Sequence, residues 1–152
     1  MRQPYSINVF LYCFINDQPN YLLLQRTARL GLPEFWQGIT GALEDDDSYI
    51  QAAAREVLEE TGLSPNQFFD VNHQYSYAIK DEWRCMYGDG PTEIVEKVFC
   101  AEVFDIPQLS DEHCGFRWCS KAEALELLSF EDNKQALLAT DRFITIHGLN
   151  EQ

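Results

Sequence analysis

A chain of 152 residues with 45% hydrophobic and 24% charged residues has the size and balance of a compact folded protein, and we expect a single domain over residues 1–152. Its 25 acidic residues outnumber its 11 basic ones, and the resulting net charge of −14 argues against partners such as nucleic acid or an anionic membrane. A small phosphorylated partner stays compatible with this charge, provided that divalent cations lie between the two anions.

Strands are predicted for the first third of the chain, which is rich in β-branched and aromatic residues. The predicted segments are a strand over residues 5–15, a turn over 16–20, a buried strand over 21–25, a loop with Gly31 and Pro33, and an extended piece over 35–40 that ends at Gly41.

The segment that begins at Ser48 carries the clearest helix signal. Ser48 and Gln51 have the spacing of a capping box, and Gly62 stands where a left-handed residue would end the helix. Apolar residues recur at helical spacing and predict one buried stripe, made of Ile50, Ala54, Val57, Leu58 and Thr61.

The second half of the chain is predicted to alternate strands with helices. Strands are expected over residues 71–79, 94–103 and 113–118, and a loop over 81–91. A second capping box, at Ser120 and Glu123, predicts a helix to about residue 128, and a last helix runs from near Asp132 to about Ile146 and ends at Gly148. This order predicts an α/β protein with a mixed sheet covered on both faces.

Cysteine usage and the N-terminus bear on location. The five cysteines are odd in number and form no CxxC pair, which favours reduced thiols in a cytoplasmic protein. The longest apolar run, residues 9–15, is too short to span a bilayer, and the first residues lack the pattern of a signal peptide.

Three glutamates of the predicted helix share one face. Glu56, Glu59 and Glu60 are spaced i, i+3, i+4, so their like charges repel unless a cation lies among them. Clustered carboxylate oxygens suit Mg²⁺ or Mn²⁺. The alternative is a solvated acidic face, because glutamate is a good helix former.

The surrounding residues resemble the signature of the Nudix hydrolase family. Gly41, Asp47, Arg55–Glu56–Val57, Glu59–Glu60 and Gly62–Leu63 fall at the spacing of that signature and match eight of its nine positions. The resemblance implies a Nudix fold, which is an α/β/α sandwich with a mixed β-sheet, and a loop–helix–loop that binds metal and pyrophosphate. Segments 24–26, 35–41, 95–100 and 112–118 are most similar to the branch that contains the dihydroneopterin triphosphate pyrophosphatases, often called dATP pyrophosphohydrolases.

Two positions depart from the family pattern. Asp46–Asp47 replaces the usual Gly–Glu, and Thr40 replaces the glycine that precedes the signature. The family resemblance implies that the acid at position 47 pairs with Arg55 and braces the loop. The shorter aspartate would loosen this brace without removing a metal ligand.

The resemblance also implies roles for individual residues. Mg²⁺, or Mn²⁺ in its place, would be bound by Glu56 and Glu60, with Glu59 assisting and Glu96 completing the site; otherwise Glu96 faces solvent from a strand. The catalytic groups would be Glu56 or Glu59 as base, with Arg55 beside them, although an acid of residues 81–89 is an alternative base. The predicted substrate contacts are Arg26, Thr40 and Arg2, with Trp36, Trp83 and Tyr87 as residues that could stack on a ring. For Trp36 the favoured interpretation is a core residue, together with Phe35, because paired aromatics before a tight turn often anchor it. The histidines at 73, 113 and 147 are expected to be structural or exposed.

The implied activity is hydrolysis of a pyrophosphate bond in dihydroneopterin triphosphate or a (deoxy)nucleoside triphosphate. ADP-ribose is the runner-up substrate, but that branch tends to carry a proline after the signature where this chain has Ala78 and Ile79. Dinucleoside polyphosphates are a further alternative. A non-catalytic nucleotide sensor is also compatible with the fold, although all three helix glutamates favour an enzyme. The oligomeric state is not readable from the sequence.

Overall fold

A computed structural model describes residues 2–28, 33–109 and 113–147 of the chain. The elements are, in order, β1 (Arg2–Ile15), β2 (Gln18–Arg26), β3 (Phe35–Gln37), β4 (Ile39–Glu44), α1 (Tyr49–Thr61), β5 (Phe69–Ala78), the 3-10 helix η1 (Asp81–Trp83), α2 (Arg84–Tyr87), β6 (Glu93–Glu102), β7 (His113–Cys119), α3 (Lys121–Leu127) and α4 (Glu131–Ile146).

The seven strands of the described ranges form one mixed sheet. Its central order is β3-β2-β1-β6-β5, and β4 and β7 pair with β1 and β2, respectively. β1 and β6 run parallel, whereas the other pairs are antiparallel. One side of β1 changes partner along its length, because it pairs with β4 from Arg2 to Val9 and with β2 from Tyr12 to Ile15.

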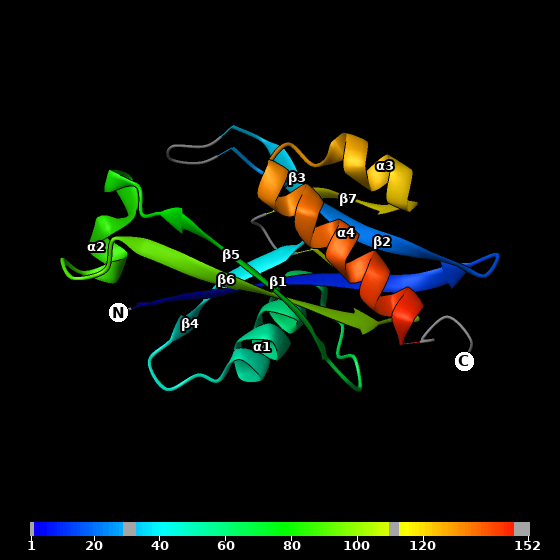
Figure 1. Cartoon of the computed structure of the whole chain (residues 1–152), viewed down its shortest axis with the longest axis horizontal. Helices are drawn as coiled ribbons and strands as arrows, with labels where there is room; N and C mark the ends of the chain where they lie inside the picture. Colours follow the sequence, from blue (N-terminus) through cyan, green and yellow to red (C-terminus); the bar gives the residue numbers. More distant parts are fainter. Residues whose placement is uncertain (1, 29–32, 110–112, 148–152) are drawn as a thin grey trace.

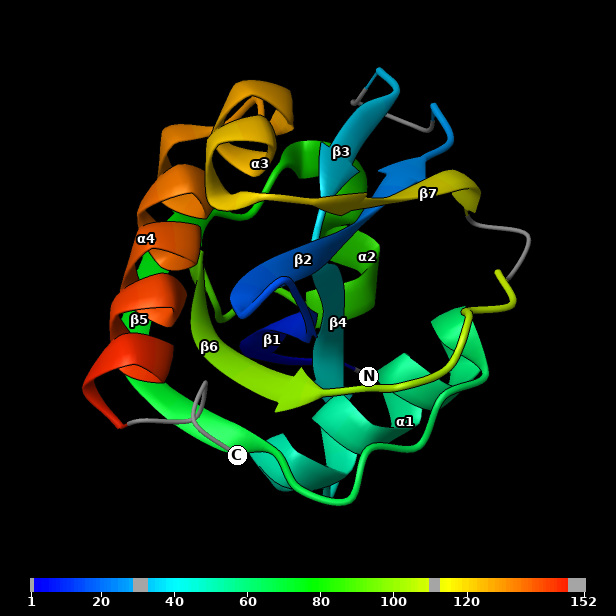
Figure 2. The same cartoon turned by 90° about the vertical axis from the view of Figure 1, so that its right-hand side faces the viewer.

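Two hydrophobic cores lie on opposite faces of this sheet. Ile7, Val9 and Leu11 of β1 belong to the core that contains Val57 of α1. The alternating residues of β1 and β2 enter the other core, which α3 and α4 complete. Figures 1 and 2 show α1 on one side of the strands and α3 with α4 on the other. The predicted α/β/α sandwich with a mixed sheet is therefore confirmed.

The ends of α1 follow the prediction, but its buried face does not. Ser48 and Gln51 form both hydrogen bonds of the capping box, and Gly62 has a left-handed φ of 73°. The predicted stripe is wrong at three of its five residues, because Ile50 and Leu58 are 46% and 53% exposed and Ala54 is exposed as well. The residues that the helix buries are Ala52, Ala53, Val57, Glu60 and Thr61. The small side chains of Ala52 and Ala53 let the helix lie close to the sheet. The buried face of the helix also contains a charged residue, Glu60.

The segment predicted as a loop over 81–91 contains the two short helices η1 and α2. Tyr87 of α2 joins Ile79 and Ile94 in a third, small core. Tyr77, Trp83 and Met86 pack against this third core. The predicted helix terminator Gly148 and the loop glycine Gly31 lie outside the described residues. None of the described helices has the length and apolar character needed to cross a membrane.

Candidate active site

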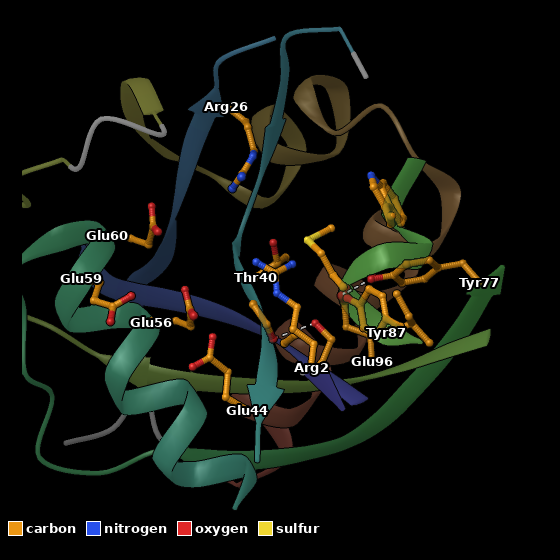
Figure 3. Close-up of a pocket in the computed structure, with 16 residues that line it drawn as sticks. Arg2, Arg26, Thr40, Glu44, Glu56, Glu59, Glu60, Tyr77, Tyr87 and Glu96 are labelled. Atoms are coloured by element: carbon orange, nitrogen blue, oxygen red, sulfur yellow. Dashed lines mark hydrogen bonds between the residues drawn. The ribbon is translucent and has the colours of Figure 1, made fainter. Parts of the chain in front are cut away.

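A cavity of about 230 Å³ opens between α1 and the α2 region. Most of the site residues predicted from the sequence line it: Arg2, Arg26, Thr40, Glu56, Glu59, Glu60 and Glu96. In Figure 3 the three α1 glutamates lie on one side, Tyr77, Tyr87 and Glu96 on the other, and Arg2 and Thr40 between them. The fold therefore brings together residues that are up to 94 positions apart in the chain, from Arg2 to Glu96. We call this space the acidic cavity.

The acidic wall of this cavity is built by α1 and β4. Glu56, Glu59 and Glu60 project from the helix, and Glu44 adds a fourth carboxylate from the end of β4. Glu44 was not predicted as a site residue, because the family signature specifies no residue at that position. The only cationic side chains among the described lining residues are Arg2 and Arg26. These two arginines can offset phosphate charge opposite the carboxylates.

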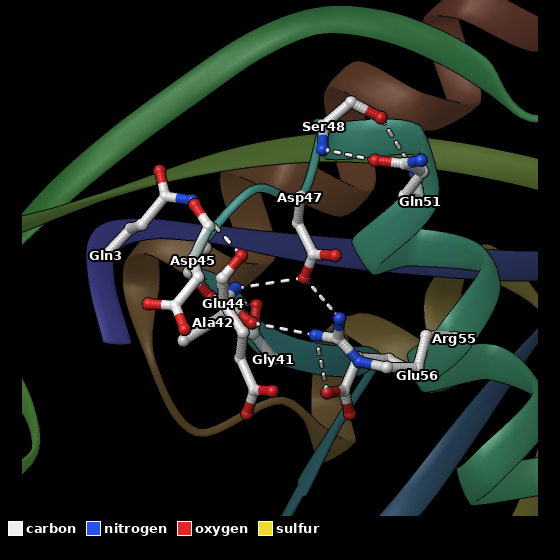
Figure 4. A network of polar contacts seen from close by, with 11 residues as sticks. Gln3, Gly41, Ala42, Glu44, Asp45, Asp47, Ser48, Gln51, Arg55 and Glu56 are labelled. Carbon is white, nitrogen blue, oxygen red and sulfur yellow. Dashed lines mark hydrogen bonds and ion pairs between the residues drawn. The ribbon is translucent and has the colours of Figure 1, made fainter. Parts of the chain in front are cut away.

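Arg55 lies behind this wall and braces it. Its guanidinium forms a short ion pair with Asp47 and donates to the carbonyl of Ala42 at 3.1 Å. It also lies 3.5 Å from Oε1 of Glu56. Oδ2 of Asp47 accepts a second hydrogen bond, from the backbone N–H of Glu44 at 2.9 Å (Figure 4). The shorter acid therefore still reaches Arg55. The hydrogen bonds from Arg55 and from the N–H of Glu44 hold the pKa of Asp47 below its usual range.

We expect Asp47→Ala to reduce stability more than chemistry. The Asp47–Arg55 pair is partly exposed, so its loss should cost about 1 kcal/mol, or about 2–4 °C in melting temperature for a chain of this size. Asp47→Glu restores the family residue and should keep or improve turnover. Calorimetry and steady-state kinetics on both variants measure this. Turnover that collapses in Asp47→Ala, with unchanged melting temperature and metal affinity, would contradict the bracing role.

Glu96 is held by tyrosines on the opposite wall. It is 4% exposed, and its two carboxylate oxygens accept hydrogen bonds from the hydroxyls of Tyr75 and Tyr77, the latter at 2.9 Å. Burial raises the pKa of Glu96, and the two tyrosine hydroxyls counteract this in part. The alternative of a solvent-facing strand residue is therefore wrong for Glu96. Neither tyrosine was predicted, because their contact depends on the register between β5 and β6.

A second cavity of about 260 Å³ adjoins the first. It shares Thr40, Tyr77, Trp83 and Glu96 with the acidic cavity. The remaining lining residues are Phe35, Gln37, Tyr75, Ala78, Lys80, Phe130, Asp132 and Asn133. We call this space the aromatic cavity, because five of its lining residues carry aromatic rings: Phe35, Tyr75, Tyr77, Trp83 and Phe130.

The structure separates the residues that were predicted to stack on a ring. Trp83 and Tyr87 line the acidic cavity, and Trp83 also lines the aromatic one. Trp36 packs against the core beneath α3 and α4, as the favoured interpretation of this residue expected. The acids of residues 81–89, predicted as alternative bases, line neither cavity.

The donor set of the acidic cavity fits a hard divalent cation. No three His, Cys, Asp or Glu side chains within the described ranges converge into a ready-made metal cluster. Mg²⁺ does not need such a cage, because it retains several waters and binds through one or two carboxylates together with substrate phosphates. The carboxylates of Glu56, Glu59 and Glu60 all face the space where such phosphates would lie.

Sheet topology, the braced glutamate helix and the acidic cavity define a Nudix hydrolase, and residues 4–140 match the model of the NUDIX domain, so the chain belongs to that family. It is 32% identical over 143 residues to the dihydroneopterin triphosphate diphosphatase of Haemophilus influenzae, which covers 90% of this chain and 88% of that protein. The solved structure of the E. coli dihydroneopterin triphosphate pyrophosphohydrolase is 29% identical, with a TM-score of 0.73 and coverage of 90% of this chain and 93% of that one. The asymmetrical bis(5'-nucleosyl)-tetraphosphatase of Sus scrofa is 26% identical, covering 85% of this chain and 83% of that protein.

Proposed function

We propose that this chain hydrolyses a pyrophosphate bond of dihydroneopterin triphosphate, or of a related (deoxy)nucleoside triphosphate, with Mg²⁺ as cofactor. The observation that carries this proposal is the junction of the acidic and aromatic cavities. A substrate with a triphosphate at one end and a flat heterocycle at the other can occupy both at once. The identity to diphosphatases of dihydroneopterin triphosphate supports the same substrate. Five free thiols are consistent with work in the reducing cytoplasm.

The aromatic cavity has the chemistry to hold a polar heterocycle. Rings of Phe35, Trp83 and Phe130 offer surfaces for stacking. Nε2 of Gln37 is buried and has no hydrogen-bond partner among the described residues, and Asn133 is a further amide in the lining of the same cavity. A buried donor without a partner is costly, so a ring with an acceptor at this edge would be favoured over an apolar ring of the same size.

Roles in the acidic cavity follow from charge and position. Bound Mg²⁺ would supply charge neutralisation and an activated water. Glu56, Glu59 and Glu60 would hold the cation, with Glu96 completing the site from the opposite wall. Arg26 and Arg2 would bind the phosphates, and Thr40 would contact the substrate where the two cavities meet. Glu56 or Glu59 would accept the proton of the attacking water, a step that supplies about 10²–10⁴-fold in rate.

A substrate panel with product analysis tests this function. Dihydroneopterin triphosphate, dATP, ADP-ribose and a dinucleoside tetraphosphate would each be incubated with the enzyme. We expect the highest kcat/KM for dihydroneopterin triphosphate or dATP, loss of activity in chelator, and recovery with Mg²⁺ or Mn²⁺. Full activity in excess chelator would overturn the metal-dependent mechanism. Binding of these ligands without hydrolysis would instead identify a nucleotide sensor.

A dinucleoside polyphosphate is the second candidate substrate, because of the similarity to the asymmetrical tetraphosphatase. Such a molecule carries a second nucleoside at the other end of its phosphate chain, which would have to lie past the acidic cavity, on the side away from the aromatic cavity. The same panel decides between the two, since preferential cleavage of the dinucleoside tetraphosphate would favour this candidate. ADP-ribose is a weaker candidate substrate, because none of the lining residues described above favours it over a nucleoside triphosphate.

A further inference from the structure

Glu60 differs from the other two glutamates of α1 in its environment. It is 4% exposed, whereas Glu56 is half-buried and Glu59 is exposed. A buried carboxylate is unfavourable unless a polar or charged neighbour compensates it. Nδ1 of His113 lies 2.6 Å from Oε2 of Glu60, and the two side chains are 2% and 5% exposed. One neighbour of Glu60 is therefore an imidazole, and no sequence pattern predicted this contact.

Strand pairing fixes the position of this imidazole. His113 is the first residue of β7 and lies opposite Arg26 of β2. It is absent from the lining of the acidic cavity, whereas Glu60 is part of it. The ring consequently contacts Glu60 from behind, on the side away from the cavity. Neither ring nitrogen forms a well-aligned hydrogen bond within the described residues, so the short contact to Glu60 is the main polar contact of the ring.

We propose that His113 is a positioning residue, whose Nδ1 holds Oε2 of Glu60 through their short polar contact and turns the other oxygen, Oε1, toward the cavity. This proposal rests on the proposed function, in which Glu60 is a metal ligand. Carboxylates that bind metals are commonly held by neighbours in this way, and loss of such a neighbour costs about 10–100-fold in metal affinity or activity. A purely structural histidine would affect stability and leave metal affinity unchanged.

The test measures metal affinity without substrate. His113→Phe keeps a ring of similar size and removes both nitrogens. We expect the apparent Kd for Mn²⁺, followed by electron paramagnetic resonance, to rise about 10–100-fold. The rate at saturating metal should fall less than the affinity. His147→Phe is the matched control, because His147 is exposed at the end of α4 and should leave the Kd unchanged.

Two further variants keep the test decisive if the apolar ring beside a buried carboxylate prevents folding. The amide nitrogen of His113→Asn falls near the position of Nδ1, whereas that of His113→Gln reaches the position of Nε2. Asparagine should therefore retain most of the Mn²⁺ affinity and glutamine should lose it. Equal affinities in these two variants, or wild-type affinity in His113→Phe, would overturn the positioning role.

A double-mutant cycle with Glu60→Gln identifies the route of the effect. If His113 acts through Glu60, adding His113→Phe to Glu60→Gln should change the Kd for Mn²⁺ little, because the carboxylate that it positions is already gone. Losses that multiply in full would overturn the proposal. A wild-type protein that neither binds Mn²⁺ nor hydrolyses nucleotides would instead overturn the proposed function, so the two failures are distinguishable.

Discussion

Glu56→Gln and Glu60→Gln should each lower turnover by about 10²-fold or more, through loss of metal or of a base. Both side chains line the acidic cavity and lie one helical turn apart, so they can bind the same cation cluster. Glutamine keeps the volume and removes only the charge. The solvated-face interpretation of α1 expects near-normal turnover from the same changes. Steady-state kinetics with saturating Mg²⁺ measures the difference.

Melting temperatures of these variants separate chemistry from folding. Without metal, each variant should melt no lower than the wild type, because one of several crowded like charges is gone. In Glu60→Gln, the amide oxygen can still accept from His113. Added Mg²⁺ should raise the melting temperature of the variants less than that of the wild type, since a bound ligand stabilises by mass action. Near-wild-type turnover and Mg²⁺ response in both variants would refute the assigned metal site.

Gly41→Ala should lower turnover by about 10²-fold, although residue 41 contributes no side-chain chemistry. A Cβ at this position would lie 2.5 Å from Cγ and 2.7 Å from Oε1 of Glu56, and closer still to Cδ. The half-buried Glu56 side chain would have to move, and a misplacement of about 1 Å at a reacting centre can cost 10²-fold. The melting temperature should change little, because a side chain moves and the backbone does not.

Gly90→Ala is the matched control for this prediction. A Cβ at position 90 would meet nothing within 4 Å, and Gly90 lines neither cavity. Its turnover and melting temperature should equal those of the wild type. Wild-type turnover in Gly41→Ala would mean that Glu56 tolerates displacement, and its assigned role would then be wrong.

Local sequence signals predicted the fold well where they describe one element at a time. Both capping boxes form, at Ser48 and Ser120, and five of the strands begin and end within a few residues of the predictions. The extended piece predicted over 35–40 is instead divided into β3 and β4, and β4 continues past Gly41 to Glu44. The loop predicted over 81–91 was wrong for two reasons. Gly88, Gly90 and Pro91 are typical of loops, and the single turn of α2 is too short to show a helical periodicity in the sequence. The predicted buried face of α1 was wrong because tertiary packing decides which residues a helix buries. Here Glu60 and two small alanines face the rest of the protein.

The candidate site was predictable where the family signature covers it and unpredictable elsewhere. The signature identified the glutamates of α1 and the partner of Arg55, which are close in sequence. The groups that hold Glu96 and Glu60 come from other strands, at Tyr75, Tyr77 and His113. Their contacts depend on strand register and pairing, which a single sequence does not encode in any local pattern.

The small core around Ile79, Tyr87 and Ile94 has a consequence for how such enzymes diversify. Its members line or support the wall opposite α1, yet they share no residue with the core beneath that helix. Mutations that reshape this wall would therefore leave the packing under the glutamates intact. Substitutions in this small core can therefore change the shape of the substrate cavity in small steps while the glutamate helix stays folded.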